Sequence, residues 1–304
     1  MEQTLSKFTG ALIGTAVGDS LGARVEGSPG FQEVAELGPR YTDDTVMTLG
    51  VAESLIERKG YDYWDMADRF VRDYEQEPWR RYGPGLPRIF RMMKSGRKGF
   101  GMLDRELVPE GSFGNGAAMR VAPVGLLYHD DPRVLREVAY HTAGITHSNE
   151  LALEGAALQA CAVALAVLAD PRNIKTNEFI GALRIFTKPG PYQEKLKIII
   201  RFLDEGAGRE QVVKELGNGV EAVNSVPTAI YAFLANPGFE SAVTYAVGLG
   251  GDTDTIGAMC GAIAGACYGI DDLPDRWKEK VENKEKIEKL AKKLWEVKEG
   301  LKAS

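Results

Sequence analysis

Residues 10–23 read GALIGTAVGDSLGA, and residues 256–269 read IGAMCGAIAGACYG. Both stretches repeat glycine and alanine at helical spacing, and residues 114–125, GNGAAMRVAPVG, have a similar composition. Small side chains let helix backbones approach closely, which suits buried helices in a compact bundle. The stretches lie far apart in the chain, and no linker or composition shift separates them. We therefore predict a single domain over residues 1–304.

The rest of the chain has helical periodicity almost everywhere. Apolar residues recur at helical spacing over residues 43–59, with Asp43 or Asp44 near the N-cap. A long Ala/Leu/Val run over residues 149–169 begins at Ser148 or Asn149. Strand signals are sparse. We predict an all-α protein with further helices over residues 192–204, 209–216, 226–235, 238–249 and 254–269.

The C-terminal segment differs from the Gly/Ala-rich helices because it is densely charged. Residues 283–299 carry many Lys and Glu, with Ile287, Leu290, Leu294 and Val297 on one helical face. We interpret this segment as an amphipathic helix that caps the bundle.

Composition narrows the possible functions. The net charge is −6, without the basic excess typical of nucleic-acid binders, so no direct nucleic-acid contact is expected. The three cysteines have no metal-ligand spacing and suit a reducing compartment. The apolar runs at 10–18 and 161–169 are too short or too broken to cross a bilayer, and no signal peptide is evident. We expect a cytoplasmic protein with no membrane contact, and a monomer.

Acidic residues gather at three glycine-rich turns that precede or follow helices. YTDDT (41–45) holds Asp43 and Asp44, LGGDTDT (249–255) holds Asp252 and Asp254, and GDSLGARVEG (18–27) holds Asp19 and Glu26. Asp and Thr are common N-caps, so each cluster alone is readily explained as a cap. Burying several carboxylates together is costly unless cations neutralise them. Carboxylate and hydroxyl oxygens suit Mg²⁺ or Mn²⁺ better than zinc.

Five motifs then occur in an order that resembles the ADP-ribosylglycohydrolase family. They are GxxxGxAxGDxLGxxxE (10–26), YTDDT (41–45), GSFGNGAAMR (111–120), THSNELALEGA (146–156) and LGGDTDTIGAMCGAIAGA (249–266). RYGPG (81–85) and ELGNGVEAVNSVPTAIYAFL (215–234) resemble the ADP-ribosylhydrolase 3 branch, which acts on serine-linked ADP-ribose and poly(ADP-ribose). The resemblance implies a compact orthogonal helical bundle with a binuclear metal cleft.

The resemblance also implies roles for particular residues. One Mg²⁺ or Mn²⁺ would be held by Thr42, Asp43 and Asp44, and a second by Asp252 and Thr255, with Asp254 bridging both. Glu26 would reach the second metal and the reacting centre, where it either activates water or protonates the leaving oxygen. Residues implied to bind substrate are Gly83, Gly85, Gly111, Ser112, Phe113, Gly114, Asn115 and His147. GSFGNG would hold the diphosphate, and Phe113 would stack on adenine.

The implied reaction is hydrolysis of the C1″ glycosidic bond of ADP-ribose. Its substrates would be serine-linked ADP-ribosylated proteins, poly(ADP-ribose) or O-acetyl-ADP-ribose, with ADP-ribose as product. Alternatives are hydrolysis of arginine-linked ADP-ribose or of another small nucleotide derivative, and a non-catalytic ADP-ribose-binding role. Two departures from the family pattern stand out. Leu107 occupies the place of one adenine-facing aromatic residue, and GPGLPRIF (83–90) lacks an aspartate found in the arginine-specific branch. GARVEGSPG (22–30), which carries Glu26, is expected to be a mobile loop.

Overall fold

The all-α prediction is confirmed in the computed structural model of the protein, which describes residues 2–28, 30–96 and 101–303. Within those ranges the only β-type pairing is an isolated bridge between Gly114 and Glu221. The longer helices are α1 (Glu2–Ala23), α2 (Asp43–Arg58), α3 (Tyr63–Gln76), α7 (Pro132–Ala143), α8 (Glu150–Leu168), α9 (Thr176–Phe186), α10 (Pro191–Glu205), α12 (Ala222–Ala235), α13 (Phe239–Gly248), α14 (Thr253–Tyr268) and α16 (Lys284–Ala303). The shorter ones are α4 (Leu86–Lys94), α5 (Met102–Leu107), α6 (Ala122–Leu127), α11 (Arg209–Glu215) and α15 (Asp275–Lys278), with 3₁₀ turns η1 (Asn115–Ala117) and η2 (Ile270–Asp272).

Helix boundaries follow the predicted ranges with two informative differences. The N-cap of α2 is Thr42, and neither aspartate takes that position. Helix α12 begins at Ala222, four residues before the predicted start, and contains Pro227 in its interior. The predicted range would make Pro227 the second residue of the helix, but it lies in the interior, where burial of the helix on both sides outweighs the one missing hydrogen bond.

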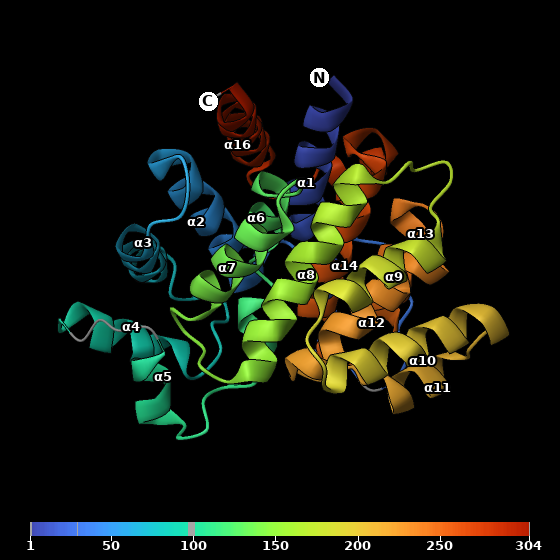
Figure 1. Cartoon of the computed structure of the whole chain (residues 1–304), viewed down its shortest axis with the longest axis horizontal. Coiled ribbons are helices and arrows are strands. Elements are labelled where there is room, and N and C mark those ends of the chain that lie inside the picture. The colour runs from blue at the N-terminus through green and yellow to red at the C-terminus, as the bar shows by residue number, and fades with distance from the viewer. Residues whose placement is uncertain (1, 29, 97–100, 304) are drawn as a thin grey trace.

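The centre of the molecule is the contact between α1 and α14, which run side by side through the middle of the bundle (Figure 1). Glycines of α1 meet glycines of α14 in reverse order: Gly10 with Gly265, Gly14 with Gly261, and Gly18 with Gly257. A Cβ atom at Gly18 would lie 2.0 Å from the carbonyl oxygen of Gly257. The two backbones therefore touch directly, and the helices are antiparallel with one register.

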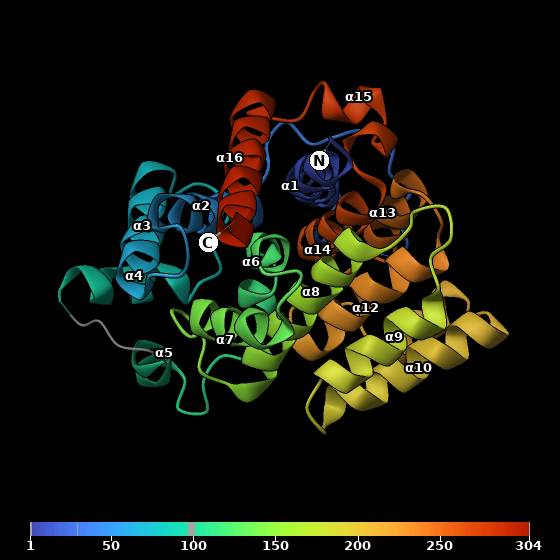
Figure 2. The same cartoon turned by 45° about the horizontal axis from the view of Figure 1, so that its top comes forward.

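Helix α8 packs against the central pair together with α12 (Figure 2). It is one helix of 19 residues, long and apolar enough by composition to cross a membrane, whereas residues 161–169 were expected to be too short. Of its most apolar window, 83% is buried inside the structure. Lys7 of α1 donates to the carbonyl oxygens of Val167 and Ala169 at 2.8 and 2.7 Å, which satisfies the end of this buried helix.

The charged C-terminal segment forms α16, which lies beside α1 and α2, near the N-terminus (Figures 1 and 2). Its face of Ile287, Leu290 and Leu294 is buried. Just before the helix, Glu282 accepts hydrogen bonds from the buried guanidinium of Arg80, at 2.6 and 3.0 Å. Arg80 also donates to the carbonyl oxygen of Tyr41, so the end of the chain supports the segment that leads into α2.

Candidate active site

The predicted site residues come together around one cleft with a volume of about 540 Å³. Its floor is formed where the N-termini of α2 and α14 approach the end of α1. The predicted residues that line it are Glu26, Asp43, Asp44, Gly83, Gly85, Ser112, Gly114, Asn115, His147, Asp252, Asp254 and Thr255. Thr42, Gly111 and Phe113 were also predicted for the site but do not line this cleft.

The first turn of α2 presents Asp43 and Asp44, and both are buried. Thr42 caps the helix, since its Oγ1 accepts from the amide of Asp44 at 3.3 Å and its hydroxyl donates to Asp44 Oδ2 at 3.0 Å. Asp19 of α1 supports the same turn by accepting from the amides of Thr42 and Thr45. With Thr42 and Asp19 satisfying the helix end, the carboxylates of Asp43 and Asp44 face the cleft.

The first turn of α14 presents the second acidic cluster. Asp252 occupies the N-cap position, yet its side chain makes no capping hydrogen bond. It accepts instead from the side-chain amide of Asn115. Asp254 is the second residue of the helix and Thr255 follows it, and both are buried. The capping interpretation therefore fails for the side chain of Asp252, which is held toward the cleft by a residue more than 130 positions away.

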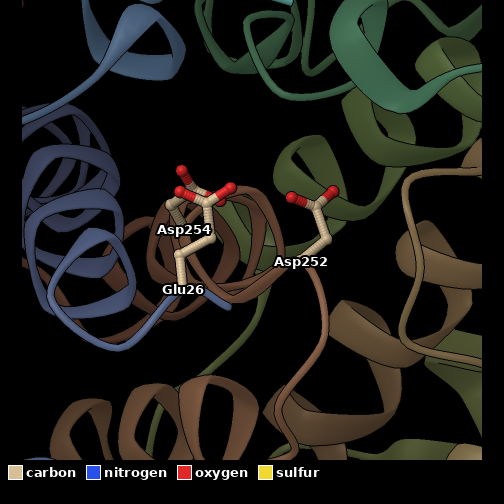
Figure 3. A group of neighbouring side chains, drawn as sticks. All are labelled: Glu26, Asp252 and Asp254. Carbon is tan, nitrogen blue, oxygen red and sulfur yellow. The ribbon is translucent and has the colours of Figure 1, made fainter. Parts of the chain in front are cut away.

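Glu26 completes the acidic group from the turn that follows α1. Candidate ligand atoms of Glu26, Asp252 and Asp254 all lie within 4.8 Å of one another. The carboxylates of Glu26 and Asp254 lie close together, with Asp252 to one side (Figure 3). Arg81 Nη1 contacts Glu26 Oε2 at 2.8 Å and also donates to the carbonyl oxygen of Ala23. Pro29, in the stretch expected to be mobile, lies outside the described residues.

The electrostatics of the cleft are unfavourable for so many carboxylates. Burial, together with the charge of Asp252, raises the pKa of Asp254 to about 9. Burial and the charge of Asp254 raise the pKa of Asp44 well above its ordinary value. Burial also raises the pKa of Asp43, with Asp19 as the next contributor. Protons or cations are therefore needed to make this arrangement favourable at neutral pH.

A divalent cation fits this donor set. Asp44 Oδ1 is buried and has no hydrogen-bond partner among the described residues, so one carboxylate oxygen is left for another ligand. The group Glu26, Asp252 and Asp254 offers only oxygen ligands, which Mg²⁺ and Mn²⁺ prefer. The N-termini of α2 and α14 also point their positive ends at the carboxylates, but partial charges cannot neutralise a cluster of this size.

The GSFGNG turn (111–116) forms one wall of the cleft, and several of its amides already have partners. The amide of Ser112 donates to Asp104 Oδ2, that of Gly114 to Ser112 Oγ, and that of Asn115 to the carbonyl oxygen of Val220. Gly111 has φ +74°, and a Cβ there would lie 2.2 Å from Ser148 Oγ. These contacts hold the turn in place and leave few of its own donors for a bound anion.

Four other predicted residues, Gly83, Gly85, Phe113 and His147, differ in how they meet the cleft. A Cβ atom at Gly83 or Gly85 would meet nothing within 4 Å, so the backbone there is open to a ligand. Phe113 is 48% exposed and lies outside the cleft lining, whereas Leu107 is part of it. His147 is buried at the wall formed by Gly114 and Gly116.

Sequence patterns assigned no role to three buried polar residues that support the cleft, although Asp19 was noted in the third acidic cluster. Asp19 supports the α2 turn. Asp104 accepts from Ser112 and from the amide and hydroxyl of Ser148, which joins the glycine turn to the start of α8. Arg120 is fully buried behind His147. Asp19 and Arg120 lie within the quoted motifs, but spacing could not reveal what their side chains contact.

The sequence and the structure of the chain are similar to those of several known proteins. A family model described as ADP-ribosylglycohydrolase matches residues 1–303. The ADP-ribosylhydrolase ARH3 of Homo sapiens is 35% identical over an alignment covering 97% of this chain and 94% of that protein. The ADP-ribosylarginine hydrolase Tri1 of Pseudomonas putida is 27% identical, covering 97% and 79%. A solved structure described as an ADP-ribosylglycohydrolase-related protein complex has a TM-score of 0.77 and 31% identity, covering 98% of this chain and 100% of that one.

Proposed function

The chain belongs to the ADP-ribosylglycohydrolase family, and from this membership we propose that it hydrolyses the C1″ glycosidic bond between ADP-ribose and an oxygen acceptor. Identity of 35% to ARH3 along nearly the whole of both chains is the observation that carries the proposal. The proposed substrates are proteins that carry ADP-ribose on serine, poly(ADP-ribose), and O-acetyl-ADP-ribose. The product is ADP-ribose.

The proposed cofactor is a pair of Mg²⁺ ions, for which Mn²⁺ is the alternative. Thr42, Asp43 and Asp44 would hold one ion, and Asp252 and Thr255 the other, with Asp254 shared. The buried, unpartnered Oδ1 of Asp44 and the raised pKa of Asp254 support a cation at this position. The chemistry that divalent cations supply when bound is stabilisation of negative charge on substrate oxygens and on water.

Glu26 is the proposed catalytic residue. Its candidate ligand oxygen lies within 4.8 Å of those of Asp252 and Asp254. The side chain is partly exposed at the cleft edge, where water and substrate can reach it. Its carboxylate can take a proton from the attacking water or give one to the leaving acceptor oxygen. As the bond to C1″ lengthens, positive charge develops on the ribose, and the surrounding carboxylates favour that charge.

Serine-linked ADP-ribose is proposed to be preferred over arginine-linked ADP-ribose. The higher identity to ARH3 than to the ADP-ribosylarginine hydrolase Tri1 supports this preference, as does the absence of an aspartate in GPGLPRIF. A guanidinium leaving group is a cation, and an aspartate at that wall of the cleft would be its natural partner. The residues present there are Leu86 and Ile89, which are apolar.

A direct comparison of substrates tests the proposal. Purified protein with Mg²⁺ is incubated with one peptide ADP-ribosylated on serine and one ADP-ribosylated on arginine, and release of ADP-ribose is followed. The serine-linked peptide is expected to be cleaved at least about tenfold faster, and removal of Mg²⁺ by a chelator should stop the reaction. Faster cleavage of the arginine-linked peptide would reverse the assignment, and binding without release from either would favour a non-catalytic role.

We also propose that the protein works in the cytoplasm as a single-domain monomer without nucleic-acid or membrane contacts. The net charge of −6 supports the lack of nucleic-acid contacts, and the continuous packing of α1 against α14 and α16 supports a single domain. Light scattering on the purified protein measures its mass in solution and would reveal a dimer.

A further inference from the structure

Arg120 is a fully buried cation without a carboxylate partner among the described residues. Its guanidinium lies over the ring of Phe70 and donates to the carbonyl oxygens of Gly116 and Thr142, each at 3.1 Å. A third hydrogen bond runs from Nη2 to Thr146 Oγ1 at 2.7 Å. Burying a charge against neutral acceptors is costly, so the position of this side chain calls for an explanation.

The hydrogen bond from Arg120 to Thr146 bears on the direction of the hydrogen bond between Thr146 and His147. A guanidinium can only donate, so Thr146 Oγ1 accepts from Arg120. The same oxygen lies 2.8 Å from His147 Nδ1, and no other acceptor for its hydrogen is found among the described residues. Within the described residues Nδ1 is thus the acceptor available to the hydroxyl hydrogen, and we infer that Nδ1 accepts it. A neutral imidazole with an accepting Nδ1 carries its hydrogen on Nε2.

Resting on the function proposed above, we propose that Arg120 and Thr146 are positioning residues which hold His147 as the tautomer with its hydrogen on Nε2. His147 then donates that hydrogen to an oxygen of ADP-ribose in the cleft. Arg120 acts through Thr146, and although the charge of Asp43 acts on its guanidinium, no salt bridge joins Arg120 to a carboxylate among the described residues.

The surroundings of Nε2 fit a donor that faces the ligand. His147 and Thr146 both line the cleft. A Cβ atom at Gly116 would lie 3.2 Å from His147 Cε1, and one at Gly114 would lie 3.9 Å from Nε2. The two glycines therefore keep this edge of the imidazole uncovered. Because amides of the same turn are already paired within the protein, the histidine supplies a donor that the turn itself lacks.

The charge state of His147 agrees with a single fixed donor. Burial, with the charge of Arg120 as a second cause, lowers the pKa of His147 to about 3. The ring is therefore neutral at physiological pH and has one N–H. Among the described residues, the hydroxyl of Thr146 is the hydrogen-bond partner found for Nδ1, so its loss removes the group that selects which nitrogen carries the hydrogen.

Nitrogen NMR tests the proposal on the intact protein. The chain has three histidines, so long-range ¹H–¹⁵N spectra can be assigned with a His147→Gln sample. Wild type should show the Nε2–H pattern for this ring. Thr146→Val keeps the shape of the side chain but removes the hydroxyl, and it should give a mixed or Nδ1–H pattern. Thr146→Ser should restore the wild-type pattern.

A matched control lies one turn earlier in the chain. Thr142 is equally buried beside Arg120, but its hydroxyl has no hydrogen-bond partner among the described residues. Thr142→Val should therefore leave the tautomer unchanged. Calorimetric titration with ADP-ribose should show about tenfold or greater weakening for Thr146→Val and no comparable change for Thr142→Val or Thr146→Ser.

Each outcome decides a separate part of the proposal. An Nδ1–H pattern in wild type, or an Nε2–H pattern in Thr146→Val, would overturn the positioning role. A changed tautomer with unchanged ADP-ribose affinity would overturn the donor role of His147. If wild type fails to bind ADP-ribose, the proposed function and the donor role fail together, while the tautomer, which is measured without ligand, still decides the positioning role.

Discussion

Helices α1 and α14 have two very different regions along one shared contact. In the middle, glycine meets glycine, most neighbouring side chains are apolar, and the backbones pack as closely as sterics allow. At the end that leads into the cleft, Glu26, Asp252 and Asp254 crowd together, and the pKa of Asp254 is raised to about 9. Close packing and burial of apolar surface both stabilise the glycine contact. The acidic end is destabilising without protons or cations to neutralise it. Such local conflicts are typical of functional sites.

The first region determines the geometry of the second. The glycine register places Gly22 against the backbone of Thr253 and Asp254, where a Cβ would lie 2.2 Å from the carbonyl oxygen of Thr253. Thr253 also donates its hydroxyl hydrogen to the carbonyl oxygen of Gly22 at 2.9 Å. Glu26 follows four residues later, so the closeness of Glu26 and Asp254 depends on contacts made without any charged group.

The largest effect is expected where the glycine contact is broken. Gly18→Ala would put a Cβ atom 2.0 Å from the oxygen of Gly257, so the two helices must separate. We expect a loss of about 3 kcal/mol or more in the free energy of unfolding, and a Tm lower by roughly 10 °C. Thermal unfolding of the variant checks this expectation.

Gly181→Ala is the matched control. Gly181 lies in α9, and a Cβ there would meet nothing within 4 Å. This variant should gain about 0.5–1 kcal/mol, because alanine favours the helix and no neighbour is displaced. Equal stability of the Gly18 and Gly181 variants would show that the α1–α14 contact is looser than the structure describes.

The second prediction removes a carboxylate from the unfavourable region. Asp254→Ala should lower kcat at least ~10³-fold, because the proposed cofactor site loses the ligand shared by both ions. The metal-free variant should unfold at the same temperature as wild type or higher, since one buried carboxylate is gone. Activity assays and unfolding with chelator present measure the two effects. Two Mg²⁺ ions bound with unchanged affinity would contradict the ligand assignment.

The third prediction separates chemistry from binding. Glu26→Gln keeps the size of the side chain but cannot exchange a proton with water, so kcat should fall ~10²–10⁴-fold. Affinity for ADP-ribose should change much less, because the other cleft residues remain. Steady-state kinetics and titration on the same preparations give both values. Near-normal turnover would leave Glu26 as a loop residue.

The difference between the two regions also explains what could be predicted from the sequence. Helical periodicity and glycine spacing are local properties, so the all-α fold and most helix ranges followed from them. The residues at 41–45 and 249–255 were singled out because their residue types are unusual for a core. Partners were not predictable, because Asp19 and Thr45, or Arg120 and Thr146, meet only after folding. Arg81 has φ +62°, a conformation normally signalled by glycine, so its backbone gave no sign in the sequence.

The fourth prediction concerns pH and metal together. Since the pKa of Asp254 is about 9 in the folded protein and its ordinary value is 3.8, the protonated form is favoured in the folded state. Stability of the metal-free protein is therefore greatest below pH 4 with respect to this group and is lost as pH rises toward 9. With these two pKa values, the expected loss between pH 5 and pH 9 is on the order of 5 kcal/mol. Chemical denaturation across this range measures it.

Magnesium should remove most of that slope, because cations take the place of protons in neutralising the cluster. In Asp254→Asn the slope should be smaller than in wild type even without metal. A metal-free wild-type protein whose stability rises between pH 5 and pH 9 would contradict the raised pKa and, with it, the view that the cleft is the unfavourable end of the α1–α14 contact.

The smallest effect is expected at Arg81, which links the end of α1 to the opposite wall of the cleft. Its ion pair with Glu26 is half-exposed and is worth about 0–1 kcal/mol. Arg81→Gly removes the pair and relieves the left-handed backbone at φ +62°, so stability should change by less than about 1 kcal/mol. Turnover should fall less than ~10-fold, because Glu26 keeps its place near Asp254 but samples more side-chain conformations. Arg81→Lys retains the charge, so its turnover should lie between that of wild type and that of Arg81→Gly.

If Arg81 acts only through Glu26, Arg81→Gly should have no further effect on turnover in the Glu26→Gln background, as a double-mutant cycle would measure. A full additional loss in that background would mean that Arg81 contacts the substrate itself.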